Sequence, residues 1–140
     1  MKKSVPVSEI MTKKVVTLNS QDSLVTAEEL FKKHHIRHIP VVKGKKVVGM
    51  LSYTDLLRIS FADAVDEDGE TIDSVVYDMF NISQIMANDV VSVSSKTTIR
   101  EVAEFLSKKE FHALPVVDDG KLVGIVTTTD LINYLLGFLY

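Results

Sequence analysis

The chain alternates between two hydrophobic spacings, and the same order of spacings occurs twice. Short β-branched runs at residues 15–18 and 90–93 predict strands. Each run precedes a segment with helical apolar spacing, and we expect Asp22 and Thr97 to cap these two helices. The apolar positions are Leu24, Ala27, Leu30 and Phe31 in the first helix, and Ile99, Val102, Ala103, Phe105 and Leu106 in the second.

A proline follows each predicted helix at the same relative place. Pro40 and Pro115 cannot lie inside a helix and bias the preceding residue towards an extended backbone. Apolar runs at 39–42 and 47–51 then flank a polar turn at 43–45, and runs at 114–117 and 122–126 flank one at 118–120. These patterns predict two hairpins. With a short helix from about residues 54 and 129, each half reads as β-α-β-β-α.

The two halves form a sequence repeat with a fixed offset. A shift of 75 places residues 7–59 on residues 82–134 without a gap, and roughly a third of the aligned positions are identical. Two copies are too few for a solenoid. We therefore expect an α+β fold in which the two repeats pack with pseudo-twofold symmetry, each covering the apolar face of the other.

Composition narrows the class of protein. The chain has 140 residues, 46% of them hydrophobic, and no cysteine, which excludes disulfides, thiolate metal sites and a cysteine nucleophile. No apolar run follows Lys2 and Lys3, so we expect no secretory signal. The apolar C-terminal tail, residues 135–140, is too short to span a bilayer. These features indicate a cytoplasmic protein without a membrane partner.

Charge is distributed unevenly between the repeats and the segment that joins them. Residues 1–59 carry eleven Lys or Arg against five Asp or Glu, whereas residues 60–81 carry seven acids and no base. We expect this connecting segment to contain a flexible acidic turn at 66–69 and then a helix through Met79 and Phe80. The first-repeat lysines lack an aromatic stacking platform, so we interpret them as a solvated face and do not expect nucleic-acid binding.

The residues after each hairpin identify a family. Residues 49–55 and 124–130 both read Gly-x-x-Ser/Thr-x-x-Asp, and each repeat also has an Ile-Met opening and a Pro-Val-Val segment. This combination resembles a tandem pair of CBS domains (cystathionine β-synthase domains), often called a Bateman module. The resemblance implies a regulatory protein. Many such pairs bind an adenine nucleotide between the copies, some bind other adenosyl ligands, and some have no known ligand.

The Ser/Thr-x-x-Asp motif has two interpretations. Ser52 with Asp55, and Thr127 with Asp130, can form capping boxes that only satisfy free N–H groups at a helix start. The same helix start also suits a phosphate, and an ionised carboxylate can accept from both hydroxyls of a ribose. In the family this aspartate holds the ribose, which favours the second interpretation.

The family arrangement also implies the walls of the two sites, because each motif takes its base pocket from the other repeat. The second-repeat motif, Thr127, Thr129 and Asp130, would take Thr12, Val15, Val16, Ile36, Arg37 and His38. The first-repeat motif, Ser52 and Asp55, would take Ala87, Val90, Val91, Phe111, His112 and Ala113. The valines can equally be strand core.

Particular roles follow for some of these residues. Phe111 could stack on a purine, and Arg37, His38 and His112 are candidate phosphate contacts. We therefore expect the Asp130 motif to bind a phosphate-bearing ligand more tightly, although His38 would also lie near Asp55.

Other chemistry is not expected. His34 and His38 are four residues apart, but Pro40 places a helix end before His38, so we expect no metal site. No catalytic motif is present, so we expect neither enzymatic activity nor a required cofactor. The expected ligand is an adenine nucleotide. We also expect the protein to form a homodimer through the apolar tail and to signal to a separate effector protein. The rival hypothesis is a dimerising scaffold whose motifs only cap helices.

Overall fold

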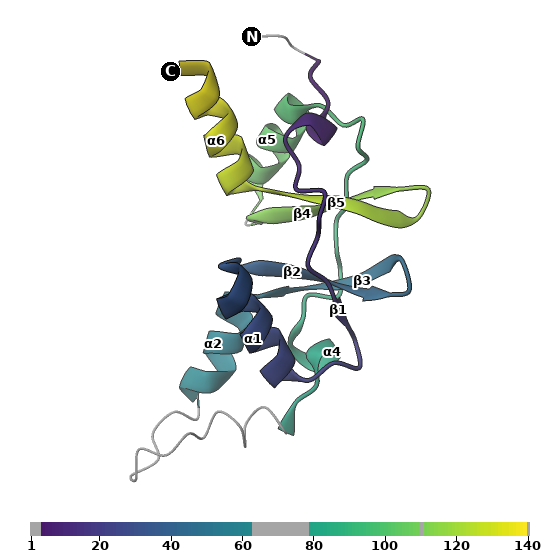
Figure 1. Ribbon diagram of the computed structural model, residues 1–140, viewed down its shortest axis with the longest axis vertical. Coiled ribbons are helices and arrows are strands. Elements are labelled where there is room, and N and C mark those ends of the chain that lie inside the picture. Colours follow the sequence, from purple (N-terminus) through teal and green to yellow (C-terminus); the bar gives the residue numbers. More distant parts are fainter. Residues whose placement is uncertain (1–3, 63–78, 110, 140) are drawn as a thin grey trace. The chain divides into compact units, whose positions relative to one another are not determined.

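The computed structural model describes residues 4–62, 79–109 and 111–139. It confirms an α+β chain with two repeats of strands and helices (Figure 1). Its contacts divide it into two compact units. The middle unit is Val16–Val90, and the terminal unit combines Met1–Val15 with Val91–Tyr140.

The middle unit is a three-stranded sheet with helices. Its sheet has the order β1-β2-β3, with β1 parallel to β2 and β2 antiparallel to β3. The helices α1 and α2 lie on the same side of the β2–β3 hairpin (Figure 1). The elements are β1 (Leu18–Asn19), α1 (Leu24–His34), β2 (His38–Lys43), β3 (Lys46–Ser52), α2 (Tyr53–Ala62) and α4 (Ile82–Ile85).

The terminal unit repeats the hairpin and its two helices. Strands β4 and β5 pair antiparallel, and α5 and α6 lie on the same side of them (Figure 1). The elements are the 3-10 helix η1 (Val7–Glu9), α5 (Ile99–Lys108), β4 (Ala113–Asp118), β5 (Lys121–Thr127) and α6 (Thr128–Leu139).

The predicted first strands are shorter than expected. In the first repeat only Leu18–Asn19 forms a strand, and in the second only Val93 forms a bridge, to Val116. Valines 15, 16, 90 and 91 lie in neither, because the chain passes between the two units at 15–16 and 90–91 and finds no ladder partner there. Their interpretation as strand residues is therefore wrong, although Val16 packs partly buried against the core of the middle unit.

The helix caps lie one residue later than predicted. Ser23 and Thr98 accept from the backbone N–H groups of Thr26 and Glu101 and so cap α1 and α5. Asp22 instead accepts from the N–H of Asn19 at 2.8 Å and closes the preceding turn. Thr97 accepts in the same way from Ser94. The hydroxyl next to the helix takes the cap, and the residue before it stabilises the loop.

Both predicted hairpins form, with different turns of equal length. Gly44 has φ 65° in the first, which is typical of a type II′ turn. Asp119 and Gly120 have φ 50° and 77° in the second, which is typical of a type I′ turn.

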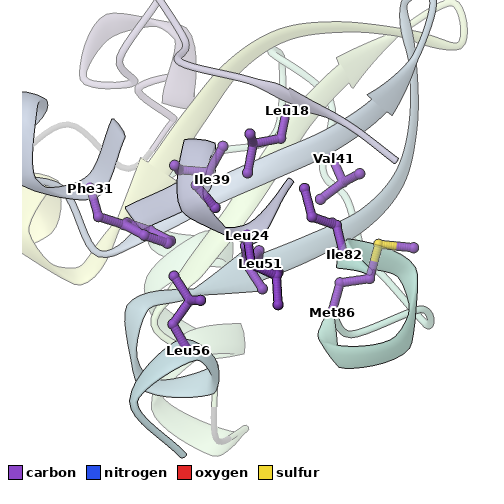
Figure 2. Packing of buried hydrophobic residues seen from close by; sticks show 10 residues of the cluster. Leu18, Leu24, Phe31, Ile39, Val41, Leu51, Leu56, Ile82 and Met86 are labelled. Carbon is purple, nitrogen blue, oxygen red and sulfur yellow. The ribbon is translucent and has the colours of Figure 1, made fainter. Parts of the chain in front are cut away.

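The core of each unit contains residues of both repeats. Figure 2 shows Ile82 and Met86 in one cluster with Val41 and Leu51 of the β2–β3 hairpin. Val7 is fully buried against the β4–β5 hairpin in the terminal unit. The opening segment of the second repeat (residues 82–90) thus belongs to the middle unit, and most of that of the first repeat (residues 7–15) to the terminal unit.

Two predicted segments remain. The acidic turn at 66–69 and most of the connecting helix lie outside the described residues; Met79 is helical and 69% exposed. At the other end, α6 continues without a break through the expected boundary at residue 135 to Leu139.

Candidate functional site

Each Ser/Thr-x-x-Asp motif lies where a strand becomes a helix. Strand β3 ends at Ser52 and α2 begins at Tyr53, while β5 ends at Thr127 and α6 begins at Thr128. The aspartate of each motif lies in the first helical turn, where unpaired N–H groups and the helix dipole favour negative charge.

Both motifs form reciprocal capping boxes. The N–H of Ser52 donates to Asp55 Oδ2 at 3.0 Å, and the N–H of Asp55 donates to Ser52 Oγ at 3.1 Å. The N–H of Thr127 donates to Asp130 Oδ2 at 2.9 Å, and the N–H of Asp130 donates to Thr127 Oγ1 at 3.2 Å. These boxes fix both aspartates while engaging Oδ2 of each.

The residue just before the first strand of each hairpin binds the same junction through its backbone carbonyl. Arg37 O accepts from the N–H of Tyr53 at 2.8 Å, and His112 O accepts from the N–H of Thr128 at 3.0 Å. His38 lies opposite Ser52 in the ladder, and Ala113 lies opposite Thr127. The backbone of Arg37 and His38 therefore lies beside the Ser52 motif, and the backbone of His112 and Ala113 lies beside the Thr127 motif.

The opening segments reach the motifs from the other repeat. Thr12 exchanges two backbone hydrogen bonds with Ile125, of 2.8 and 3.0 Å, two residues before Thr127. Ala87 does the same with Met50, at 2.9 and 3.0 Å, two residues before Ser52. The structure thus brings Thr12 near the Thr127 motif and Ala87 near the Ser52 motif, the pairing that the family resemblance implied for these two residues.

A glycine makes room for each opening segment. A Cβ on Gly124 would lie 2.6 Å from Met11 Sδ and 3.0 Å from Thr12 O. A Cβ on Gly49 would lie 2.8 Å from Met86 Cε. The glycine of the Gly-x-x-Ser/Thr-x-x-Asp motif is therefore needed for close approach of this segment.

The remaining predicted wall residues have mixed surroundings. Phe111, 39% exposed, stacks on Phe105 with ring centroids 6.1 Å apart. Ile36 packs partly buried against the core of the middle unit, and Ala113 is buried. Arg37, His112 and Thr129 are exposed, as is Val91; His38, Val15, Val16 and Val90 are half-buried. Whether Ile36, Arg37, His38, Phe111, His112 and Ala113 wall the opposite motif stays a prediction.

Sequence reasoning missed Arg58. Its Nη1 lies 3.6 Å from Asp55 Oδ1, one helical turn after the motif. The equivalent residue of the second repeat is Asn133, and within the described part of the chain Asp130 has no ion pair. The i, i+3 spacing on a predicted helix was a signal that could have found this pair.

The histidines of the first repeat do not share a helix face. Helix α1 ends at His34, His35 takes a left-handed conformation with φ 53°, and His38 begins β2. Across the described residues, no three His, Asp or Glu side chains group as metal ligands would.

A comparison with known families decides the class of protein. The model of the CBS domain matches residues 7–62 and again residues 82–137. The chain belongs to the CBS domain family. Both repeats carry the match, so the chain is a tandem CBS pair.

Solved structures agree with this assignment. A putative acetoin utilization protein (AcuB) from Vibrio cholerae is 29% identical, with a TM-score of 0.81 over 96% of this chain and 93% of that one. The CBS domain pair of protein MJ0100, solved with 5′-methylthioadenosine and S-adenosyl-L-methionine, is 28% identical, with a TM-score of 0.77 over 94% of this chain and 99% of that one.

Curated relatives show the pair in different settings. CBS domain-containing protein YhcV of Bacillus subtilis is 29% identical over 89% of this chain and 81% of its own length. The chain spans only 21% to 46% of several longer relatives, some of which are enzymes. Among the described helices, none has both the length and the hydropathy to cross a membrane.

Proposed function

We propose that this CBS pair is a regulatory module that binds an adenosyl ligand, in the first place an adenine nucleotide, at its Ser/Thr-x-x-Asp motifs. The observation that carries the proposal is the pair of matching strand-to-helix junctions, each with a fixed aspartate in the first helical turn. The MJ0100 pair, which resembles this chain over nearly its whole length, was solved with two adenosyl compounds.

The chemistry follows from the junction. A carboxylate has two acceptor oxygens, so an aspartate whose Oδ2 serves the cap can still accept from a ribose hydroxyl through Oδ1. The helix start beside it offers N–H groups and partial positive charge to a phosphate. Binding changes the output of the module only if the ligand prefers one state of the protein. We propose that this output reaches a separate effector protein in the cytoplasm.

Thermal melting tests binding directly. We expect AMP, ADP, ATP or S-adenosylmethionine, at about 100 times its dissociation constant, to stabilise the fold by roughly 2.7 kcal/mol. That corresponds to a shift of several degrees in Tm. If none of these ligands shifts Tm at millimolar concentration, the scaffold hypothesis is favoured.

Substitution of the motif aspartates distinguishes a residue that holds a ribose from one that only caps a helix. Asp55→Asn and Asp130→Asn should each lower stability by about 0.5–2 kcal/mol if the residue caps a helix. If the residue also holds a ribose, calorimetry should show an affinity loss of about tenfold. Glu101→Gln is the matched control, because Glu101 lies in the first turn of α5 and its carboxylate accepts from the Thr98 hydroxyl, which caps that helix. Unchanged affinity in both aspartate variants would remove the ribose role.

We further propose that the module is a homodimer through α6. Ile132, Leu135 and Leu136 are 55%, 48% and 49% exposed, and their spacing places them on one helix face. Removing residues 134–140 should shift the protein towards monomer in sedimentation at tens of micromolar. A full-length chain that sediments as a monomer at that concentration would contradict self-association.

A further inference from the structure

The two motifs have the same backbone but different charges around them. Beside the Ser52 motif the structure places Arg37, whose carbonyl accepts from the first residue of α2, and Arg58, whose guanidinium contacts Asp55. At the matching positions beside the Thr127 motif stand His112 and Asn133. One junction therefore has an arginine side chain paired with its aspartate, whereas the matching position of the other junction holds an asparagine.

Neighbouring segments do not cancel this difference. Lys13 and Lys14 follow Thr12, and Asp89 follows Ala87, but among the described residues none of the three forms an ion pair. The helices before β2 and β4 both end with basic residues: Lys32, Lys33 and His34 in α1, and Lys108 with the C-cap Lys109 in α5.

The ion pair between Arg58 and Asp55 is weak enough for Arg58 to leave Asp55 when a ligand binds. Arg58 is 74% exposed in its side chain and Asp55 20%, and the 3.6 Å separation is long for a charge-assisted hydrogen bond. An exposed pair of this kind contributes little stability. Arg58 can therefore turn from Asp55 to a phosphate while still offsetting the repulsion between the carboxylate and that phosphate.

We propose that Arg58 sets the charge of the ligand that each motif accepts. The Ser52 motif takes a phosphorylated adenosyl ligand, because Arg58 offsets the charge of Asp55. The Thr127 motif takes an adenosyl ligand without phosphate, neutral or cationic, because Asp130 has no cation partner within the described part of the chain. This inference rests on the proposed function and reverses the ranking expected from the sequence.

Reciprocal variants test the assignment one motif at a time. Calorimetry with AMP, adenosine and S-adenosylmethionine would be done in an Asp130→Asn background, which isolates the Ser52 motif, and in an Asp55→Asn background, which isolates the Thr127 motif. Arg58→Asn installs the second-repeat residue in the first repeat, and Asn133→Arg does the reverse.

The expected results are changes in charge preference. In the first background, AMP should bind more tightly than adenosine, and Arg58→Asn should weaken AMP about fivefold while leaving adenosine unchanged, the effect of one unit charge across partly screened solvent. In the second, adenosine and S-adenosylmethionine should bind more tightly than AMP, and Asn133→Arg should strengthen AMP about fivefold. Added salt should reduce both effects.

Lys46→Asn is the matched control, since it removes one positive charge at the far end of β3, about 20 Å along the strand from Ser52. The inference would be overturned if Lys46→Asn lost as much AMP affinity as Arg58→Asn. It would also be overturned if the ratio of AMP affinity to adenosine affinity were the same at both motifs, with and without Arg58. In either case the proposed function would stand. Failure of all three ligands to bind the wild-type chain would overturn the proposed function and this inference with it.

Discussion

The β3–α2 and β5–α6 junctions have nearly the same hydrogen bonds but different flanking side chains. Their capping distances are 3.0 and 3.1 Å in one and 2.9 and 3.2 Å in the other. The residues that build this frame, a hydroxyl and an aspartate three apart, are kept in both copies. Arg58 and Asn133, which do not build it, differ. A duplicated frame can therefore hold two sites of different chemistry.

A second difference lies at the hairpin ends. In the terminal unit Asp118 accepts from the Ser95 hydroxyl at 2.5 Å and from the Ser95 N–H at 3.0 Å, which ties the loop before α5 to β4. The matching residues of the first repeat are Ser20 and Lys43, which cannot make this pair of bonds. The parallel pairing of this loop with the hairpin occurs in both units, as β1 with β2 in the middle unit and as the Val93–Val116 bridge in the terminal unit. The terminal unit therefore adds side-chain hydrogen bonds to a loop contact that both repeats share.

The largest expected effect tests the exchange of opening segments. Ile82→Ala should destabilise the protein by about 2–5 kcal/mol, because Ile82 is fully buried. Hydrogen exchange should show the loss of protection in β2 and β3, although Ile82 belongs to the second repeat. Val7→Ala, a smaller truncation, should act on β4 and β5. Loss of protection in the hairpin of the residue's own repeat would contradict the exchange.

The next largest effect is expected from alanine at the two motif glycines, and its size should differ between the two units. Gly124→Ala should cost about 1–3 kcal/mol by overpacking. Gly49→Ala should cost less, because its Cβ would meet only the Met86 side chain, whereas at Gly124 it would also meet the Thr12 carbonyl oxygen. Chemical denaturation measures both. Gly137→Ala is the control and should stabilise α6, since nothing lies within 4 Å of that Cβ. Equal losses at 49 and 124 would show that the methionines alone decide the cost.

The capping hydroxyls should behave alike. Ser52→Ala and Thr127→Ala each remove one bond to the N–H of the motif aspartate, so each should lower the free energy of unfolding by about 1 kcal/mol. Denaturant titration without ligand measures the two losses. A clear difference between them would mean that the junctions are less equivalent than their distances indicate.

The smallest expected effect is a change in the stability of the protein at acidic pH. The hydrogen bond from the Ser95 hydroxyl, then that from the Ser95 N–H, holds the pKa of Asp118 below its ordinary value. Because this pKa is lower in the folded state, the stabilisation is present above the unfolded-state pKa of about 3.9 and is lost as the pH falls through the folded-state pKa.

Asp118→Asn should therefore be less stable than wild type near neutral pH, and the difference in Tm should shrink below about pH 4. Lys43→Asn, at the matching position of the first repeat, should show no such change in this range. A constant difference between Asp118→Asn and wild type down to low pH would contradict the role of the ionised carboxylate.

Much of the fold could be predicted from the sequence because its signals are local. The two hairpins follow from prolines, glycines and alternating apolar runs, and the offset of 75 showed that whatever one half forms, the other forms too. The motif fixed its own geometry, since Ser52 and Asp55 are three residues apart and each serves the backbone N–H of the other. The family assignment, which rests on these repeated signals, is confirmed.

The rest depended on contacts between distant parts of the chain. Nothing near Val15 or Val90 in the sequence shows that the chain leaves one compact unit there. Their β-branched runs therefore predicted strands longer than the pairing at Leu18–Asn19 and Val93 that the structure forms. Equally, Ile82 is an ordinary apolar residue until tertiary packing places it in the core of the other repeat's hairpin. The sequence by itself determined the repeated unit and its motif through short-range hydrogen bonding and hydrophobic period. Only the tertiary structure decided which opening segment completes which unit, because burial is shared among residues that chain order does not bring together.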